Sequence, residues 1–285
     1  MKNYVVDGHE DSLLPADAEW RLVWADEFDG KKGGKPDPDK WLYRTKFWGY
    51  NSKTYIKEEG VELDGKGNLL FKLVAKDGNY YSTQLQTGSN AFDYMVINGR
   101  NAISTFGERP FWPLEKLPKP TFMHRFGYYE VRCKLQKQPG WWSAFWLQSP
   151  SIGTTIDGKY SGIECDILEC FDGPTKKVTS GLFLGGYAAE CQRVARVEYF
   201  PENTSHDAFH RFGVEWNEDG YIFYCDGKKT ATTTEVSSHV EQFILLSTEC
   251  QGYRVGNLDK PSDELKQTVL PDEFVVDYVR VFDKI

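Results

Sequence analysis

Short runs of β-branched and aromatic residues, each closed by a turn signal, are the feature that most limits what this chain can fold into. Phe212–Trp216 is followed by Asp219-Gly220, and Tyr221–Cys225 by Asp226-Gly227. The last run, Phe274–Phe282, alternates around its valines. Helical periodicity is nearly absent. Many short strands at this spacing are typical of an antiparallel sandwich or jelly roll, so we predict an all-β fold.

The length of the chain fits a single domain of this kind. A chain of 285 residues is long for an average domain but within the range of one all-β sandwich. Residues 1–20 are polar with little periodicity, and we expect them to form an N-terminal strap. Residues 21–285 then form a single-domain β-sandwich.

Charge and composition exclude several classes of partner. The formal net charge is −8, and an acidic chain repels phosphate backbones, so we expect no nucleic-acid partner. No stretch approaches 18 apolar residues, so we expect no membrane span. Aromatic residues make up 15% of the chain. Some must fill the core, and the surplus suits a surface that binds the C–H faces of sugar rings.

The cysteines and the N-terminal residues allow a prediction of the cellular compartment. Of the six cysteines, none forms a Cys-x-x-Cys pair. Cys165 and Cys170 are five positions apart on one expected strand, roughly 16 Å at about 3.3 Å per residue, which is beyond disulfide reach. We expect buried free thiols, as in a reducing compartment. The first residues carry no apolar h-region or cleavage site, which predicts a cytoplasmic protein, or a secreted one if a native leader has been lost.

The stretch Gly162–Cys170 carries three carboxylates in a pattern that a regular strand cannot place. Alternation puts Glu164 and Asp166 on one face but sends Glu169 into the core, where an unpaired carboxylate is very costly. One β-bulge between Asp166 and Glu169 returns Glu169 to the acidic face and Leu168 to the core. We therefore predict a bulged strand with three acids on one face.

Crowded carboxylates suit the hydrolysis of a glycosidic bond. One must stay ionised as nucleophile while a second keeps a proton for the leaving oxygen, and like charges in proximity drive the pKa values of such a pair apart. We expect Glu164 and Glu169 about 5–5.5 Å apart, the separation of a retaining enzyme. Asp166 would share a proton with Glu164 and orient it. A solvated acidic strand edge or a calcium-binding patch is the alternative.

A tryptophan-rich run precedes the acidic one. In Trp141–Leu147, Trp142 and Trp146 are four apart and share a face if the strand is regular, with Ala144 between them. Two indoles beside three carboxylates suit a sugar-binding surface, and core packing is the alternative.

The sequence resembles glycoside hydrolase family 16, whose bulged Glu-x-Asp-x-x-Glu signature reads here Glu164–Glu169. Other blocks resemble the family in order along about residues 20–285. They are Trp24–Gly30, Gly127–Arg132, Trp142–Leu147, His210–Trp216 with Tyr224–Gly227, and Val276–Val281.

The resemblance implies a concanavalin A-like jelly roll with a cleft on its concave face. It assigns the nucleophile to Glu164, the acid/base to Glu169 and an assisting role to Asp166. Substrate contacts fall to Trp142, Trp146, Asn51 and Tyr187. Catalysis would need no cofactor. A structural calcium on the convex face would take ligands from Glu27 and Asp277, and the protein would be a monomer acting on a polysaccharide or oligosaccharide.

Two departures from the family bear on the substrate. Phe183 stands where many relatives carry a histidine, and Glu249 stands where laminarinases usually have a Gly-Gly pair. Strand alternation places Glu249 at the cleft wall, accepting sugar hydroxyls or pairing with Arg254, and a solvated strand-end position is the alternative.

Four interpretations therefore remain. The first is an endo-acting hydrolase of a β-1,3- or β-1,3/1,4-glucan. The second is the same chemistry on a β-galactoside-containing glycan of agar, carrageenan, porphyran or mucin type. The third is a non-catalytic, lectin-like protein, and the fourth is transglycosylation. A sulfated substrate would require several cleft cations. The candidates are Arg100, Arg109, Arg193, Arg196 and Arg254, which we interpret as solvated loop charges.

Overall fold

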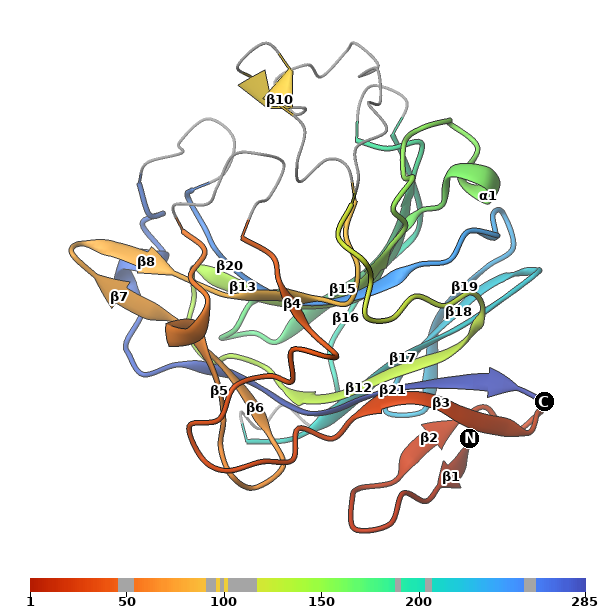
Figure 1. The fold of residues 1–285 in the computed structure, drawn as a ribbon, viewed down its shortest axis with the longest axis horizontal. Coiled ribbons are helices and arrows are strands. Elements are labelled where there is room, and N and C mark those ends of the chain that lie inside the picture. The colour runs from red at the N-terminus through yellow and green to blue at the C-terminus, as the bar shows by residue number, and fades with distance from the viewer. Residues whose placement is uncertain are drawn as a thin grey trace.

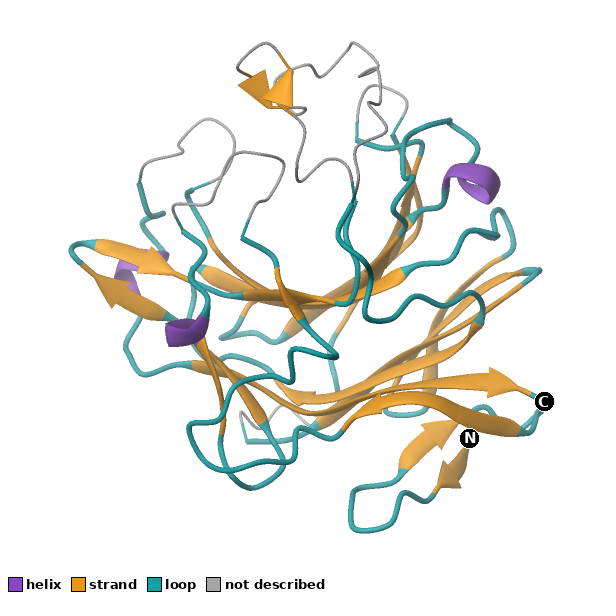
Figure 2. Cartoon of the chain, in the orientation of Figure 1, coloured by secondary structure: helices purple, strands orange, loops and turns teal. Residues whose placement is uncertain are grey.

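Two large antiparallel sheets make up most of the protein, as a computed structural model shows (Figure 1). The structure describes residues 1–45, 54–90, 96–97, 100–101, 117–187, 191–202, 207–253 and 260–285. Helix is confined to short turns (Figure 2), which confirms the all-β prediction. None of the helices in these ranges is long and apolar enough to cross a membrane. They are η1 (Glu58–Gly60), α1 (Gly158–Ser161) and η4 (Leu265–Gln267).

The first sheet, called here the outer sheet, lies next to both chain ends (Figure 1). Its strands are β3 (Trp20–Asp26), β5 (Val61–Leu63), β6 (Leu69–Lys72), β12 (Gly127–Lys134), β17 (His210–Asn217), β18 (Gly220–Cys225), β19 (Lys228–Thr233) and β21 (Glu273–Lys284). They run in the order β19-β18-β17-β12-β21-β6-β5, and β3 pairs with β21 off this path.

The second sheet, called here the cleft sheet, has a concave free face (Figure 1). Its strands are β4 (Leu42–Tyr43), β9 (Gln84–Gln86), β13 (Trp141–Gln148), β14 (Glu164–Asp172), β15 (Lys177–Leu184), β16 (Gln192–Tyr199) and β20 (Phe243–Cys250). They run in the order β16-β15-β14-β13-β20-β9-β4, so β14 lies between β13 and β15. Three small two-stranded sheets complete the fold. They are β1 (Lys2–Tyr4) with β2 (Ser12–Leu14), β7 (Val74–Lys76) with β8 (Asn79–Tyr81), and β10 (Val96–Ile97) with β11 (Arg100–Asn101).

The core fills the space between the two sheets. Phe145 and Leu147 of β13 belong to the same fully buried cluster as Val131 of β12 and Val214 of β17. Alternation along β13 therefore sends these side chains inward and leaves their neighbours for the opposite face. Apolar side chains thus pack the cleft sheet against the outer sheet. The opposite, free face of the cleft sheet can carry polar groups.

The N-terminal residues form a β1–β2 hairpin against the outer sheet. Leu14 is fully buried in a small cluster with Tyr128 of β12 and Phe282 of β21. The fully buried Arg280 donates to the carbonyl oxygen of Glu10 at 2.7 Å and to Ser12 Oγ at 2.9 Å. The hairpin therefore covers a charged strip that the outer sheet would otherwise expose.

We expect the hairpin to contribute to stability through Leu14. Leu14 is 0% exposed whereas Val5, in the turn after β1, is 68% exposed. Leu14→Ala should lower the free energy of unfolding by about 2–5 kcal/mol, because it removes buried methyl groups and leaves a cavity. The matched change Val5→Ala should stay within about 0.5 kcal/mol. Urea denaturation measures both, and equally small effects would show that the hairpin does not pack on the sheet.

Candidate functional site

A cavity of about 250 Å³ lies on the free face of the cleft sheet. Side chains from β13, β14, β15, β16 and β20 line it, together with one residue that follows β15. They are Trp142, Ala144, Trp146, Glu164, Asp166, Glu169, Phe171, Phe183, Tyr187, Arg193, Arg196, Ser247 and Glu249.

A β-bulge in β14 creates the acidic part of this cavity. On the neighbouring strand β13, Phe145 lies opposite Leu168, and the next residue, Trp146, lies opposite Asp166. Ile167 is therefore an extra residue in β14. Ile167 and Leu168 are both buried in the core, although they are adjacent. The predicted bulge is confirmed.

The bulge places all three carboxylates on the same face, although Asp166 follows Glu164 by two positions and Glu169 follows Asp166 by three. Glu164 and Glu169 are half-buried, and Asp166 between them is only 3% exposed. The flanking Cys165 and Cys170 are fully buried in the core. Between Glu164 and Cys170, the strand therefore directs its apolar side chains and thiols into the core and its three acids into the cavity.

Hydrogen bonds hold the Glu164 carboxylate from one side. Tyr187 donates its hydroxyl to Glu164 Oε2, and the amide of Gln148 donates to the same oxygen at 3.3 Å. Gln148 also donates to the Tyr187 hydroxyl and accepts from the side chain of Asn90. Burial, followed by the charge of Glu164, raises the pKa of Tyr187 well above its usual value. Tyr187 thus keeps its proton and remains a donor.

Gln148 is a site residue that the sequence analysis missed. It follows Trp146 by two positions and pairs with Glu164 across β13 and β14, so the alternation that found the tryptophans also points to it. Its partner Asn90 was not predictable in this way. Asn90 is 58 residues away in sequence, and only the fold brings it to Gln148.

The two predicted tryptophans both line the cavity, on either side of Ala144. The Trp142 ring lies 5.4 Å from the ring of Phe171. The Trp146 indole donates to Ser247 Oγ at 2.9 Å, and the Arg44 guanidinium lies 5.3 Å from its ring centre. Neither tryptophan belongs to the main core between the sheets, whereas Trp141 does. Trp146 packs instead in a small buried cluster with Phe243 and Leu245 on the free face of the cleft sheet, and the role of the two tryptophans in binding sugar stays a prediction.

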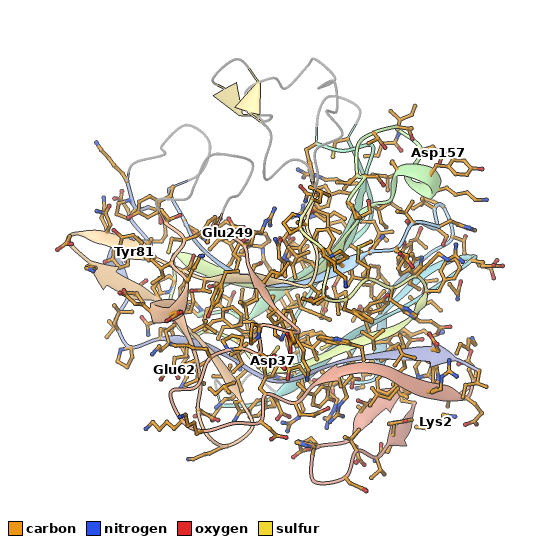
Figure 3. The ribbon with its side chains drawn as sticks, in the orientation of Figure 1. Lys2, Asp37, Glu62, Tyr81, Asp157 and Glu249 are labelled. Atoms are coloured by element: carbon orange, nitrogen blue, oxygen red, sulfur yellow. The ribbon has the colours of Figure 1, made fainter. Side chains whose placement is uncertain are left out.

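Glu249 lies at the cleft wall, on the face that alternation predicted. It pairs with Trp142 across β13 and β20, lines the cavity and is 5% exposed. Figure 3 labels it on the cleft sheet. A solvated strand-end position is excluded by this burial. The predicted partner Arg254 and the predicted sugar contact Asn51 lie outside the described residues.

Two arginines also line this cavity. They are exposed, as we expected of solvated charges, but the prediction that they lie in loops is wrong. Arg193 and Arg196 lie on strand β16, not in a loop, and both line the cavity beside the carboxylates. Sequence could not place them because β16 is identified as a neighbour of β15 only by the sheet order.

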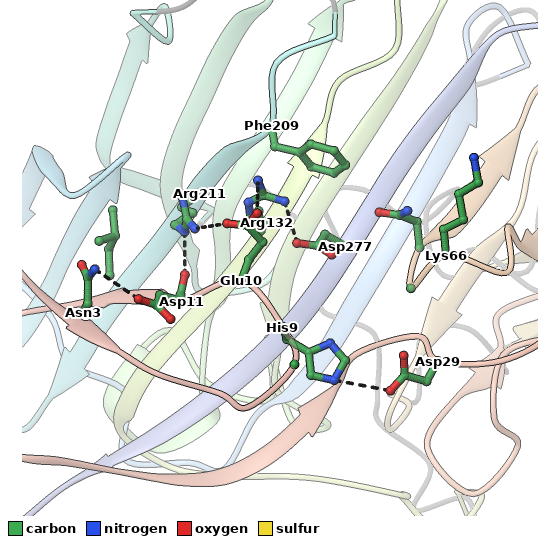
Figure 4. A pocket seen from close by; sticks show the side chains of 14 residues that line it. Asn3, His9, Glu10, Asp11, Asp29, Lys66, Arg132, Phe209, Arg211 and Asp277 are labelled. Atoms are coloured by element: carbon green, nitrogen blue, oxygen red, sulfur yellow. Dashed lines mark hydrogen bonds and ion pairs between the residues drawn. The ribbon is translucent and has the colours of Figure 1, made fainter.

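The residues considered for calcium lie on the other side of the molecule. Asp277 lines a separate, polar cavity of about 800 Å³ beside the N-terminal hairpin (Figure 4). Arg132 donates to Asp277 at 2.7 Å, and Arg280 donates to both oxygens of Glu27 at 2.8 and 2.7 Å. Within the described ranges, no group of three His, Cys, Asp or Glu side chains could hold a metal ion. The calcium site stays a prediction.

A family model and several known proteins match the chain. The sequence model of the Glycosyl hydrolases family 16 matches residues 118–251. The chain is 25% identical over 281 residues to a glucan endo-1,3-beta-glucosidase A1 of Niallia circulans, covering 94% of this chain and 38% of that protein. It is 22% identical to a beta-glucanase of Rhodothermus marinus, covering 92% of this chain and 85% of the relative. The chain thus spans well under half the length of the first of these relatives.

The fold is also found among solved structures. The catalytic domain of an endo-1,3-beta-glucanase (laminarinase) from Thermotoga petrophila superposes with a TM-score of 0.64 at 22% identity, covering 94% of this chain and 99% of that one. An endo-1,3-beta-glucanase from Streptomyces sioyaensis superposes with a TM-score of 0.65 at 19% identity, covering 95% and 98%. These likenesses show that the chain shares their fold.

The thiols offer a test of how the site is built. All six cysteines are free, and Cys191 alone is half-buried while the others are buried. Burial, followed by the charge of Glu164, raises the pKa of Cys191. A thiol reagent should therefore label only Cys191 in the native protein, with a rate that keeps rising above pH 9 because the thiolate is the reactive form.

Cys191→Ser is the matched variant and should abolish native labelling. Denaturation without reductant should expose all six thiols of the original protein. A labelling rate that levels off below pH 8 would contradict the environment described for Cys191, and a count of four or two thiols would reveal disulfides.

Proposed function

We propose that this chain belongs to glycoside hydrolase family 16 and is a retaining, endo-acting hydrolase of a β-1,3- or β-1,3/1,4-glucan. The observation that carries the proposal is the bulged strand β14, which presents Glu164, Asp166 and Glu169 together in one cavity. The names of the relatives support the substrate, because they describe endo-1,3-beta-glucanases and beta-glucanases.

We assign the nucleophile to Glu164. The attacking carboxylate must be ionised, and hydrogen bonds donated to a carboxylate favour its charged form. Tyr187 and Gln148 both donate to Glu164 Oε2. They also restrict the rotation of the carboxylate, so that the oxygen not held by them is the one directed at the sugar.

We assign the acid/base to Glu169. It first donates a proton to the leaving oxygen, which breaks the glycosidic bond as Glu164 bonds to the sugar, and it then removes a proton from the water that releases the sugar. Glu169 lies opposite Ala144 on β13, so no bulky side chain stands across from it there. Asp166, buried between the two glutamates, would couple to their titration and keep Glu164 oriented. These steps need no cofactor.

The tryptophans provide the sugar-binding surface in this proposal. Trp142 and Trp146 flank Ala144, and all three side chains line the cavity. Sugar C–H faces pack on such rings. A non-catalytic lectin is disfavoured because all three acids are present and grouped. A β-galactoside-containing glycan is a second candidate substrate, favoured by the buried Glu249 carboxylate in the cavity wall, which can accept hydrogen bonds from sugar hydroxyls and so select among sugars.

We expect Glu164→Gln and Glu169→Gln each to lower kcat on laminarin or lichenan at least about 10³-fold, because both roles need an ionisable oxygen. Glu198→Gln is the matched control, since Glu198 pairs with Lys177 at 3.5 Å away from the cavity. Chromatography of the oligosaccharide products measures turnover and also shows whether cleavage is internal.

The two variants should differ with a substrate that has an activated leaving group. In Glu169→Gln the covalent intermediate still forms, and added azide should restore turnover because azide needs no base to attack. Azide should leave Glu164→Gln inactive. Rescue of neither variant would contradict the assignment of Glu169, and near-normal activity of either would contradict the proposed function.

The stereochemical outcome is a separate prediction. Two displacements at one carbon return the original configuration, so the first product should carry a β-anomeric reducing end. Proton NMR within the first minutes, before mutarotation, distinguishes the anomers. An α-anomer appearing first would mean a single displacement and would rule out Glu164 as a nucleophile.

A further inference from the structure

The short segment that follows β9 is fixed against β20 and ends at a buried asparagine. The Thr87 N–H donates to the carbonyl oxygen of Ile244 at 2.9 Å, and the Ile244 N–H donates back to Thr87 Oγ1 at 2.9 Å. At Gly88 a Cβ would lie only 2.7 Å from Phe243 Cβ, so the backbone can approach this ring only without a side chain. This close packing fixes the backbone that carries Asn90, whose side chain is fully buried.

The side chain of Asn90 donates to Gln148 Oε1, and this contact determines which way the Gln148 amide faces. An amide has an acceptor oxygen and a donor nitrogen of similar shape, so it can present either one to a neighbour. With its oxygen held by Asn90, Gln148 directs Nε2 toward Glu164 Oε2, at 3.3 Å, and toward the Tyr187 hydroxyl. The reversed amide would set a carbonyl oxygen against the carboxylate and a donor against the donor of Asn90.

The negative charge of Glu164 also attracts Nε2 of Gln148, but only while that charge is present. In a double displacement the carboxylate becomes an ester when it bonds to the sugar, and its charge is lost. Asn90 contacts Gln148 through neutral groups, so its effect on the amide does not depend on the state of Glu164. Both amides are fully buried, so water does not compete for this contact. The donor is therefore in place when the carboxylate forms again.

We propose that Asn90 is a positioning residue of the reaction, which fixes the amide of Gln148 so that the Glu164 carboxylate always faces a hydrogen-bond donor. The inference rests on the proposed function for the role of Glu164 as nucleophile. Asn90 is not among the described residues that line the cavity, so it acts on Glu164 only through Gln148.

The first test observes the Glu164 carboxyl directly and needs no turnover. In protein labelled with carbon-13 at the glutamate carboxyl carbons, the NMR signal of Glu164 is the one missing from Glu164→Gln. Hydrogen bonds donated to a carboxylate favour its charged form, so their loss should raise the midpoint of its titration. We expect the midpoint to lie about 1 pH unit higher in Asn90→Leu, which is a tenfold change in acidity.

A double-mutant cycle shows whether Asn90 acts through Gln148. Gln148→Leu should raise the midpoint of Glu164 at least as much as Asn90→Leu does, and combining the two substitutions should raise it no further. Asn90→Asp keeps the shape of the side chain but offers Gln148 only acceptors, so its effect should be larger with Gln148 present than in Gln148→Leu. Ser89→Ala is the matched control, since the Ser89 hydroxyl is buried and has no hydrogen-bond partner among the residues that the structure describes.

The pH profile of hydrolysis gives a second measurement. In Asn90→Leu the acidic limb of kcat/KM should move to higher pH by the same amount, whereas the basic limb, which depends on the proton of Glu169, should stay in place. At the optimum kcat should fall about tenfold with KM unchanged, because a hydrogen bond to a charged group is lost. A loss of packing alone would lower activity at every pH and leave both limbs where they are.

The outcomes separate this inference from the proposed function. Urea denaturation first shows that each variant is folded. An unchanged Glu164 titration in folded Asn90→Leu, or a rise that Asn90→Leu still causes in the Gln148→Leu background, overturns the inference and leaves the hydrolase standing. A rise that depends on Gln148, in a protein that cleaves none of laminarin, lichenan, agarose and carrageenan, would support the effect of Asn90 on Glu164 and contradict the hydrolase.

Discussion

One extra residue in β14 is the constraint on which the site depends. A strand in one of two packed sheets has a core face and a free face. Successive side chains along the strand point to these two faces in turn. Phe145 and Trp146 of β13 are adjacent, but their partners Leu168 and Asp166 have Ile167 between them. Because of this extra residue, Ile167 and Leu168 both enter the core. Without the bulge, either Glu169 would be buried among apolar side chains or the core would lose Leu168. The same insertion therefore satisfies the core and groups the acids.

The register of the cleft sheet determines which side chains lie beside the bulged segment of β14 and so shapes the cavity. Ala144 pairs with Glu169 on one side and with Ser247 on the other, so one row of the sheet has small residues next to a carboxylate. The neighbouring positions on β13 are the bulky Trp142 and Trp146. Ala144, Ser247 and Glu169 of this row line the cavity together with Trp142 and Trp146. The shape of the cavity thus follows from side-chain size along paired strands.

On the opposite face of the sandwich, charged side chains form close ion pairs that hold the structure together. Arg280 and Glu27 form a two-point ion pair, and Arg280 is fully buried under the N-terminal hairpin. Arg132 pairs with Asp277 in the same region. In the cleft, by contrast, Arg193 and Arg196 line the same cavity as the three carboxylates of β14. Close pairs of opposite charge therefore support the scaffold on the side of the outer sheet.

The sequence by itself determined the elements whose signal is local. Turn residues between alternating runs predicted the strands, and the conflict between alternation and the cost of a buried carboxylate predicted the bulge before Glu169. The same two-residue period placed Trp142, Trp146 and Glu249 on the cleft face, because side-chain direction along one strand depends only on position within it.

The tertiary structure decided everything that depends on which strand lies beside which. Asn90 meets Gln148, Tyr187 meets Glu164, and Arg193 reaches the cavity only because β16 lies next to β15 and carries its own bulge. The pairing of Glu27 with Arg280 and of Asp277 with Arg132 was likewise decided by the outer sheet. Such contacts depend on strand order and register, which come from the packing of the whole core and leave no local pattern in the residues that make them.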